Sequence, residues 1–211
     1  KEIVVAIMGV ETNYGATQGE FNSLEALATL AFYYVPRHSF FESELVALLN
    51  YAWRNQLDLH TLNGSYAGAL GIMQFMPSNL LLYATSASKT KDIDIFSNPN
   101  DAIASINVYL TKHGHWLANQ PVIASLELTS SQWQHINKHY PNKQTIKLDP
   151  KLRNLLNLKV RTHPAQWLII SRDGTKPQAI VAFPNFSSIL SYNNSFNYAR
   201  SVYELSQALK K

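Results

Sequence analysis

Glu11 is the residue of this chain whose type and position best suit proton transfer. The first 14 residues have the pattern of a helix that ends at Gly15, a residue type suited to the left-handed position after a helix. With about 3.6 residues per turn, the residues that share a face with Glu11 are apolar: Val4, Ile7 and Met8. An apolar setting and the negative end of the helix dipole both disfavour a charged carboxyl group, so we expect a raised pKa for Glu11. A carboxyl group that keeps its proton near neutral pH can serve as a general acid.

A structural role for Glu11 is the alternative, with its methylene groups along the apolar neighbours and its carboxylate in water. The pattern places a more polar set on the opposite face of the helix: Glu2, Val5, Gly9, Thr12 and Asn13. The helix pattern alone leaves both roles open.

Glycoside hydrolysis usually needs a second carboxyl group beside the acid. The candidates all have positions typical of solvated loops or helix caps: Glu20, Glu25, Asp92, Asp94 and Asp101. The sequence therefore offers no convincing second carboxyl group for Glu11.

A glycine-rich segment is the second place where chemistry is suggested. Residues 63–71 contain three glycines, a density that indicates a loop with unusual backbone angles or a close approach to a ligand. Within it, the Ser65 hydroxyl could bond a carboxylate or a sugar, or it could close a turn. Gln74 stands among apolar residues and therefore needs a hydrogen-bond partner, either a ligand in a cleft or buried backbone.

Tyrosine side chains suit sugar binding because each combines a flat apolar face with a hydroxyl group. Four of the 11 tyrosines are candidates for this role: Tyr66, Tyr109, Tyr192 and Tyr198. The other tyrosines are expected to pack in the core or on the surface.

The elements that must position these residues are mainly helical. Helices are expected at residues 23–34, with Ser23 as the cap, 39–56, a short stretch from Pro77, 98–114 and 196–209. After Gly114 the pattern changes to a short helix near Trp133 and Ile136 and strands at 145–148, 167–171 and 179–183. The Asp173-Gly174 pair predicts a hairpin turn between the last two strands. The sequence thus predicts an α+β fold that is mainly α.

Composition excludes several classes of function. The net charge of +4 modestly favours anionic partners, but there is neither a dense Lys/Arg cluster nor zinc-finger spacing, so nucleic acid is not expected. The absence of cysteine excludes disulfide and thiol chemistry. His113 and His115 lack a third nearby ligand in the sequence, and we expect no metal site and no cofactor.

No apolar run approaches the roughly 20 residues that a membrane-spanning helix needs. The chain starts inside a helix pattern without an initiator Met, so we expect any signal peptide or lipid anchor to lie outside it.

Two sequence blocks, GVETNYG at 9–15 and GSYAGALGIMQFMPS at 64–78, together resemble the membrane-bound lytic murein transglycosylase B family. The resemblance continues through 24–31, 98–105, the Tyr192-Asn193 pair and 198–209, and is weakest at 118–180. It implies a lysozyme-like helical core over residues 1–117, a small mixed α/β insertion over 118–190, and a C-terminal segment, 191–211, that returns to the core.

The resemblance implies that Glu11 acts alone as acid and then base on the β-1,4 bond between N-acetylmuramic acid and N-acetylglucosamine. It would form 1,6-anhydro ends without water. It further implies that Ser65 lies beside the glutamate, that Tyr192 and Tyr198 border the cleft, and that Asn193 orients the acetamido group or the glutamate. The implied partner is the glycan strand of peptidoglycan, and the implied setting is the periplasm of a Gram-negative bacterium. The protein is expected to be a monomer, with membrane contact only through an anchor outside this chain.

One segment departs from the family pattern. The family often has an Asp- and Gly-rich calcium loop before the Asn-Pro helix, whereas residues 86–94 here read SASKTKDID. Calcium takes about six to eight oxygen ligands, usually with several carboxylates. We therefore expect no calcium site.

Two other functions remain as alternatives. A glycan-binding module without catalysis would lack the glutamate, which is present as Glu11. A lysozyme-type hydrolase on the same fold would need a positioned water and a second base.

Overall fold

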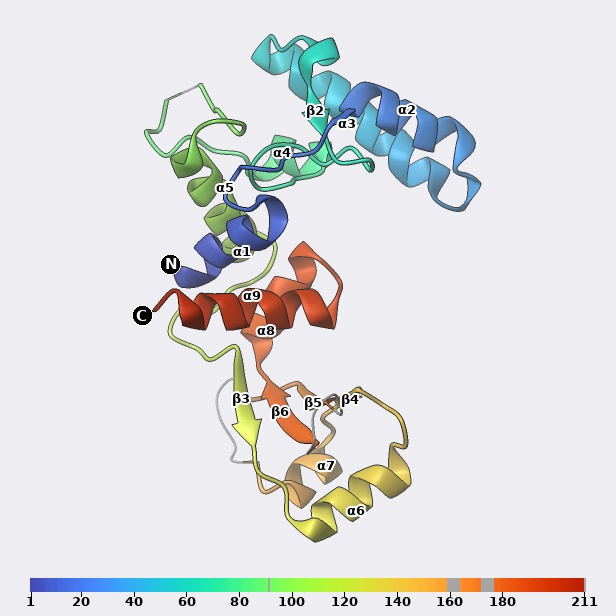
Figure 1. The fold of residues 1–211 in the computed structure, drawn as a ribbon, viewed down its shortest axis with the longest axis vertical. Helices are drawn as coiled ribbons and strands as arrows, with labels where there is room; N and C mark the ends of the chain where they lie inside the picture. Colours follow the sequence, from blue (N-terminus) through green and yellow to red (C-terminus); the bar gives the residue numbers. More distant parts are fainter. Residues whose placement is uncertain (91, 159–163, 172–176, 211) are drawn as a thin grey trace. The chain divides into compact units, whose positions relative to one another are not determined.

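The computed structural model describes residues 1–90, 92–158, 164–171 and 177–210. The chain forms two compact units, Lys1–Tyr109 with Arg200–Lys211, and Leu110–Ala199 (Figure 1). The two boundaries between these units fall within helices α5 and α9. The domain boundaries expected at residues 117 and 190 stay a prediction.

The first unit is mainly helical. Its elements in chain order are α1 (Glu2–Thr12), β1 (Phe21–Asn22), α2 (Ser23–Tyr33), η1 (Val35–Arg37), α3 (His38–Asn55), η2 (Leu59–Thr61), β2 (Asn63–Gly64), α4 (Pro77–Tyr83), α5 (Pro99–Lys112) and α9 (Phe196–Ala208). Helix α3 packs against both α2 and α4, and β1 pairs antiparallel with β2. The six helices predicted for this unit are confirmed. Five agree to within two residues at both ends, and α4, which was predicted only by its start, begins at Pro77.

The start of α2 differs from the prediction by one residue. The side-chain oxygen of Asn22 accepts hydrogen bonds from the backbone N–H groups of Leu24 and Glu25, both at 3.1 Å. Asn22 is therefore the cap, and the predicted cap Ser23 is the first helical residue and fully buried. An asparagine one position earlier satisfies the same unpaired N–H groups.

Helix α4 begins at Pro77, as predicted, and a buried carboxylate covers its first turn. The backbone N–H and the hydroxyl of Ser78 donate to the two carboxylate oxygens of Glu44 at 2.9 and 2.7 Å. Glu44 belongs to α3 and is only 4% exposed. Its charge stands at the positive end of α4, where an anion is stabilised, and it fixes α4 on α3.

The second unit is an antiparallel sheet with helices. Its elements in chain order are β3 (Ile123–Leu126), α6 (Ser130–His139), β4 (Thr145–Lys147), α7 (Pro150–Leu155), β5 (Trp167–Ser171), β6 (Gln178–Ala182) and α8 (Pro184–Tyr192). The strand order is β3-β6-β5-β4, with Trp167 of β5 opposite Ala182 of β6. The predicted strands β4 to β6 and helix α6 are confirmed, whereas β3, α7 and α8 were not predicted. The predicted Asp173-Gly174 turn lies outside the described residues.

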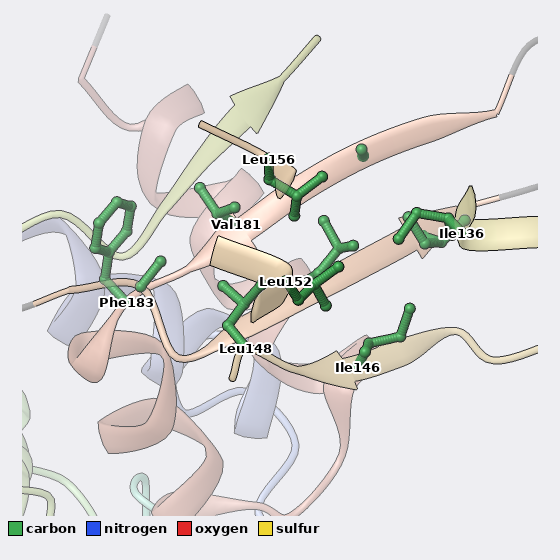
Figure 2. Packing of buried hydrophobic residues seen from close by; sticks show 11 residues of the cluster. Ile136, Ile146, Leu148, Leu152, Leu156, Val181 and Phe183 are labelled. Atoms are coloured by element: carbon green, nitrogen blue, oxygen red, sulfur yellow. The ribbon is translucent and has the colours of Figure 1, made fainter. Parts of the chain in front are cut away.

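This second unit has its own hydrophobic core. Side chains from the sheet and from α6 and α7 gather between them (Figure 2). The cluster includes Ile136, Ile146, Leu148, Leu152, Leu156, Leu168, Ile170, Val181 and Phe183. Outside this cluster, the fully buried Asn185 of α8 bonds to backbone atoms of Leu117 and Gln120 through both its amide oxygen and its amide nitrogen.

The Glu44 carboxylate provides a stability test. Glu44→Ala leaves the half-buried N–H of Ser78 without its acceptor, so we expect it to lower the free energy of unfolding by about 1–3 kcal/mol. Urea denaturation followed by circular dichroism measures this loss. The matched control is Glu42→Ala on the exposed side of the same helix, which we expect to change stability by less than about 0.5 kcal/mol. Equal losses in the two variants would contradict a capping role for Glu44.

Candidate active site

Glu11 lies on the last turn of α1 and is half-buried. The apolar stripe predicted beside it is confirmed, because Ile7 and Met8 are 0% and 4% exposed. The helix ends earlier than predicted, since Asn13 already has a left-handed φ of 49°, and Tyr14 and Gly15 follow with φ of 60° and 94°. Asparagine is among the non-glycine residues that best tolerate this conformation. The chain therefore turns away from the helix axis two residues after Glu11.

Thr12 ties this end of α1 to the glycine-rich loop. Its hydroxyl lies 2.8 Å from the carbonyl oxygen of Ile72, to which it donates, and 3.3 Å from that of Met8. The same hydroxyl accepts the backbone N–H of Gly15 at 2.9 Å. Thr12, which the helix pattern places on the face opposite Glu11, is fully buried. These hydrogen bonds hold its side chain against a loop that the helix pattern alone cannot reveal.

Gly9 and Tyr14 form a second local feature that the sequence did not indicate. An added Cβ at Gly9 would lie 2.8 Å from both the Cζ and the hydroxyl oxygen of Tyr14. The Tyr14 ring thus folds back over α1, and it remains 47% exposed. The sequence pattern that could have revealed this contact is a glycine two residues before Glu11 together with a tyrosine three residues after it.

Within the glycine-rich loop, Ser65 closes a turn. Its hydroxyl oxygen accepts the backbone N–H groups of Ala67 at 3.3 Å and Ala69 at 3.0 Å. Gly68 completes the turn with a φ of 85°, and an added Cβ there would lie 2.4 Å from Leu27. Only glycine fits this position without a shift in its neighbours. Of the two roles left open for Ser65, turn closure is present, and it leaves the hydroxyl proton to be donated elsewhere.

Gln74 bonds to backbone, which is one of the two alternatives open from the sequence. Its amide nitrogen donates to the carbonyl oxygens of Gln18 at 2.9 Å and Gly71 at 3.0 Å. Gln18, which sequence analysis missed, donates in turn to the carbonyls of Gly15 at 3.1 Å and Phe96 at 2.8 Å. These two amides join the chain after α1 to the glycine-rich loop.

The tyrosine candidates of the first unit differ in exposure. Tyr66 is 73% exposed and offers an open ring face. Tyr109 is 4% exposed, and its ring lies 5.2 Å from the rings of both Phe75 and Tyr83. The expectation that Tyr109 offers a face to a sugar is corrected, because α5 turns this ring into the core.

The other three predicted residues lie together in the second unit. Tyr192 is the last residue of α8, and Asn193 is its exposed C-cap. The rings of Tyr192 and Tyr198 are nearly parallel, with centroids 6.4 Å apart and an angle of 10°. The backbone N–H of Ser195 donates to the Asn193 carbonyl at 2.7 Å, which shapes the turn between the two tyrosines. The structure therefore groups Tyr192, Asn193 and Tyr198, and separately groups the end of α1 with the glycine-rich loop.

The buried carboxylates are the candidates for a second catalytic group. Two carboxylates are buried among the described residues, Glu44 and Asp101. Glu44 accepts two hydrogen bonds from Ser78, and Asp101 accepts the backbone N–H groups of Ala87 and Asp94. Both therefore serve backbone structure. Across the described part of the chain, no three acidic, histidine or cysteine side chains are arranged to hold a metal ion.

None of the helices in the described ranges is both long enough and apolar enough to cross a membrane.

The comparisons with known proteins bear on the whole chain. Its sequence matches the family model described as the transglycosylase SLT domain over residues 1–207. It is 35% identical over 208 residues to membrane-bound lytic murein transglycosylase B of Escherichia coli (strain K12). That match covers 99% of this chain and 56% of the relative, so the chain spans a little over half the length of this curated protein.

Solved structures give the same result for the fold. The Escherichia coli lytic transglycosylase Slt35 in complex with bulgecin A superposes with a TM-score of 0.85 at 34% identity, covering 99% of this chain and 65% of that one. Slt35 has also been solved in complex with calcium. SltB3 from Pseudomonas aeruginosa, in complex with NAG-NAM-pentapeptide, superposes with a TM-score of 0.78 at 29% identity, covering 99% of this chain and 56% of that one. The predicted α+β, mainly helical fold of lysozyme-like type is confirmed, and the chain belongs to the transglycosylase SLT domain family.

Proposed function

We propose that this chain is the catalytic part of a lytic transglycosylase that cleaves the β-1,4 bond between N-acetylmuramic acid and N-acetylglucosamine in peptidoglycan. One observation carries the proposal. Glu11 stands half-buried on the last turn of α1, and the next residue, Thr12, anchors that turn to the loop that carries Ser65. A carboxyl group held on a fixed backbone beside a loop of ligand-type side chains suits general acid catalysis.

In the proposed first step, Glu11 donates its proton to the glycosidic oxygen. The bond from the anomeric carbon of N-acetylmuramic acid breaks, and its electron pair goes to that oxygen. The acetamido oxygen of the same sugar stabilises the resulting cation in place of a protein nucleophile.

In the second step, the Glu11 carboxylate takes the proton of the C6 hydroxyl of N-acetylmuramic acid. The C6 oxygen attacks the anomeric carbon and forms the 1,6-anhydro ring. Glu11 ends the cycle protonated, as it began, and no water is consumed.

The other candidate residues of the site are proposed to bind the glycan. Ser65 and Gln74 would do so through the atoms that their backbone hydrogen bonds do not use. For Ser65 this is the hydroxyl proton, and for Gln74 it is the side-chain oxygen, since the amide nitrogen already serves backbone. Tyr66 offers its exposed ring, whereas Tyr109 stays a candidate whose ring is buried. Tyr192, Asn193 and Tyr198 are proposed to contribute the paired rings and an exposed amide.

Hydrolysis is the second candidate function, and a second catalytic carboxylate would indicate it. It needs a water held by a second base. Glu44 and Asp101, the buried carboxylates of the described residues, both accept backbone hydrogen bonds, which favours transglycosylation. Binding without catalysis is less supported, because Glu11 is present and held in place.

The proposed partner is peptidoglycan. The complex of SltB3 with NAG-NAM-pentapeptide and the net charge of +4, which suits the carboxylates of peptide stems, both support it. We propose the periplasm as the location, with any membrane contact through an anchor outside this chain, and a monomer as the active form.

The test is mass spectrometry of the soluble products from purified peptidoglycan. The chain should release anhydromuropeptides, and Glu11→Gln should lower their rate of formation by at least about 100-fold because the general acid is lost. The matched control, Glu20→Gln, changes an exposed glutamate nearby in sequence and should keep the parent rate. Reducing-end products would establish a hydrolase instead. Bound glycan without any product from the parent would favour the binding module.

Thr12 gives a second test, of positioning. Thr12→Val keeps the shape of the side chain but removes the hydrogen bonds to Ile72 and Gly15. We expect kcat to fall more than KM rises, and the free energy of unfolding to drop by about 1–3 kcal/mol. Turnover of a soluble glycan and urea denaturation measure the two effects.

Two further variants complete this test. Thr12→Ser keeps the hydroxyl and should restore kcat, which a loss of packing alone would not allow. Thr29→Val, at an exposed position of α2, is the control for a Thr-to-Val change. A Thr12→Val enzyme with parental kcat would exclude a positioning role.

A further inference from the structure

Three hydroxyl groups meet in the loop between α4 and α5. The side-chain oxygens of Ser86 and Ser88 lie 2.9 Å apart, and each lies 3.1 Å from that of Thr90. We call these three residues the hydroxyl triangle. They occupy alternate positions, and Lys89 between them has a left-handed φ of 61° that curls the loop so that the three side chains converge. Such convergence of alternate side chains is the geometry by which a loop wraps an ion.

The hydroxyl triangle satisfies its own hydrogen bonds. Each hydroxyl group supplies one proton and accepts through its oxygen, so three protons can serve the three sides. The Thr90 hydroxyl also lies 3.3 Å from the Asp92 carbonyl, an acceptor that can take its proton in exchange. The centre of the loop is therefore held by neutral groups that need no cation.

Two carboxylates of this region, Asp94 and Asp101, are committed to the loop backbone. Asp101, which is 2% exposed, accepts the N–H of Ala87 at 2.8 Å through one oxygen and that of Asp94 at 2.9 Å through the other. Asp94 accepts the N–H groups of Phe96 and Ser97 at 2.9 Å, and the Ser97 hydroxyl as well. Desolvation alone would raise the pKa of Asp94, but these hydrogen bonds, led by the Ser97 hydroxyl, hold it below its usual range. Both side chains are therefore occupied by N–H and O–H donors of the loop.

Ser105 of α5 fastens the start of the same loop. Its buried hydroxyl donates to the Asp101 carbonyl at 2.7 Å and accepts the N–H of Thr85 at 3.0 Å. With Asp101, it connects the loop to the first turns of α5. The loop is thus closed at its start, centre and end by hydrogen bonds.

A calcium ion does not fit the residues present. It requires about six to eight oxygen ligands, usually including several carboxylates. The hydroxyl triangle offers three neutral oxygens at mutual hydrogen-bond distances, and the carboxylates of Asp94 and Asp101 already bind backbone N–H groups. The loop sequence also contains two lysines.

We propose that the hydroxyl triangle takes the place of a cation in this loop, so that the loop closes without metal and the stability of the chain does not depend on calcium. Slt35, the relative solved with calcium, shows that a member of the family can be obtained with that ion. Here Ser86, Ser88 and Thr90 hold the loop closed through their own hydroxyl groups.

The first experiment is thermal unfolding of the chain in excess EDTA and in millimolar calcium. We expect the two Tm values to agree within about 1 °C, because a ligand that binds only the folded state raises Tm. A rise of about 5 °C or more with calcium would overturn the proposal.

The second experiment removes two of the three hydroxyl groups of the hydroxyl triangle. The double variant Ser86→Ala/Thr90→Ala should lower Tm by about 5 °C in EDTA, and calcium should not restore it. Ser43→Ala is the control, because its hydroxyl bonds the Ser39 carbonyl on the exposed face of α3 and should matter little. A double variant as stable as this control would overturn the role of the hydroxyl triangle.

The third experiment converts the hydroxyl triangle into a cation site. Ser86→Asp, Ser88→Asp and Thr90→Asp together place three carboxylates where the hydroxyls converge, so their repulsion should lower Tm in EDTA. Calcium should then raise Tm by about 5 °C or more, and isothermal titration should detect binding that the parent lacks. A triple variant that calcium neither binds nor stabilises, whether added before or during refolding, would show that the hydroxyls do not stand in a cation's place.

Discussion

The hydrogen bond from the Thr12 hydroxyl to the Ile72 carbonyl is the constraint on which the candidate site depends. It joins the last turn of α1 to a loop 60 residues later in the chain, and both groups are buried. A buried hydroxyl and a buried carbonyl each cost free energy if unpaired, so the contact fixes the two segments together. Because Glu11 precedes Thr12 directly, its backbone position is set by the same bond. The Thr12 hydroxyl also accepts the N–H of Gly15, the last of the three left-handed residues that end the helix.

Polar side chains of the candidate site form hydrogen bonds to the backbone, and only their remaining atoms can bind a ligand. The Ser65 hydroxyl closes the glycine-rich turn, and the Gln74 amide joins the loop to the chain after α1. A loop with left-handed glycines leaves many N–H and C=O groups without helix or sheet partners, and these side chains supply the missing bonds. In the proposed function, the hydroxyl proton of Ser65 and the side-chain oxygen of Gln74 bind the glycan. Removal of either side chain would therefore disturb loop geometry together with any ligand contact, so substitutions that keep the structural bond are the informative ones.

The helices and strands that could be predicted from the sequence are those that a local residue pattern determines. Helices with an apolar stripe, a proline at the first turn or a cap nearby were placed to within two residues, and strands β4 to β6 were found by their apolar runs. Sequence reasoning missed β3, whose pairing with β6 joins segments more than 50 residues apart, and the short helices α7 and α8, although each carries a proline in its first turn. The open ring predicted for Tyr109 is wrong because burial is decided by distant segments, which here supply the rings of Phe75 and Tyr83. Glu11 was identifiable because its apolar helical neighbours are local.

The candidate site and the α4–α5 loop share a mode of construction that bears on how the enzyme would work. Thr12, Ser65, Gln74 and the hydroxyl triangle all act through neutral hydrogen bonds, whereas the ion pairs His38–Glu42 and Arg200–Glu204 lie at i, i+4 positions on helix surfaces. Neutral bonds of this kind do not titrate between acidic and neutral pH, and salt screens them little. The proposed mechanism needs a single group that gains and loses a proton in each cycle while everything around it keeps its geometry. A framework of hydroxyl and amide bonds meets that need, because the groups that form these bonds do not titrate while Glu11 gains and loses its proton.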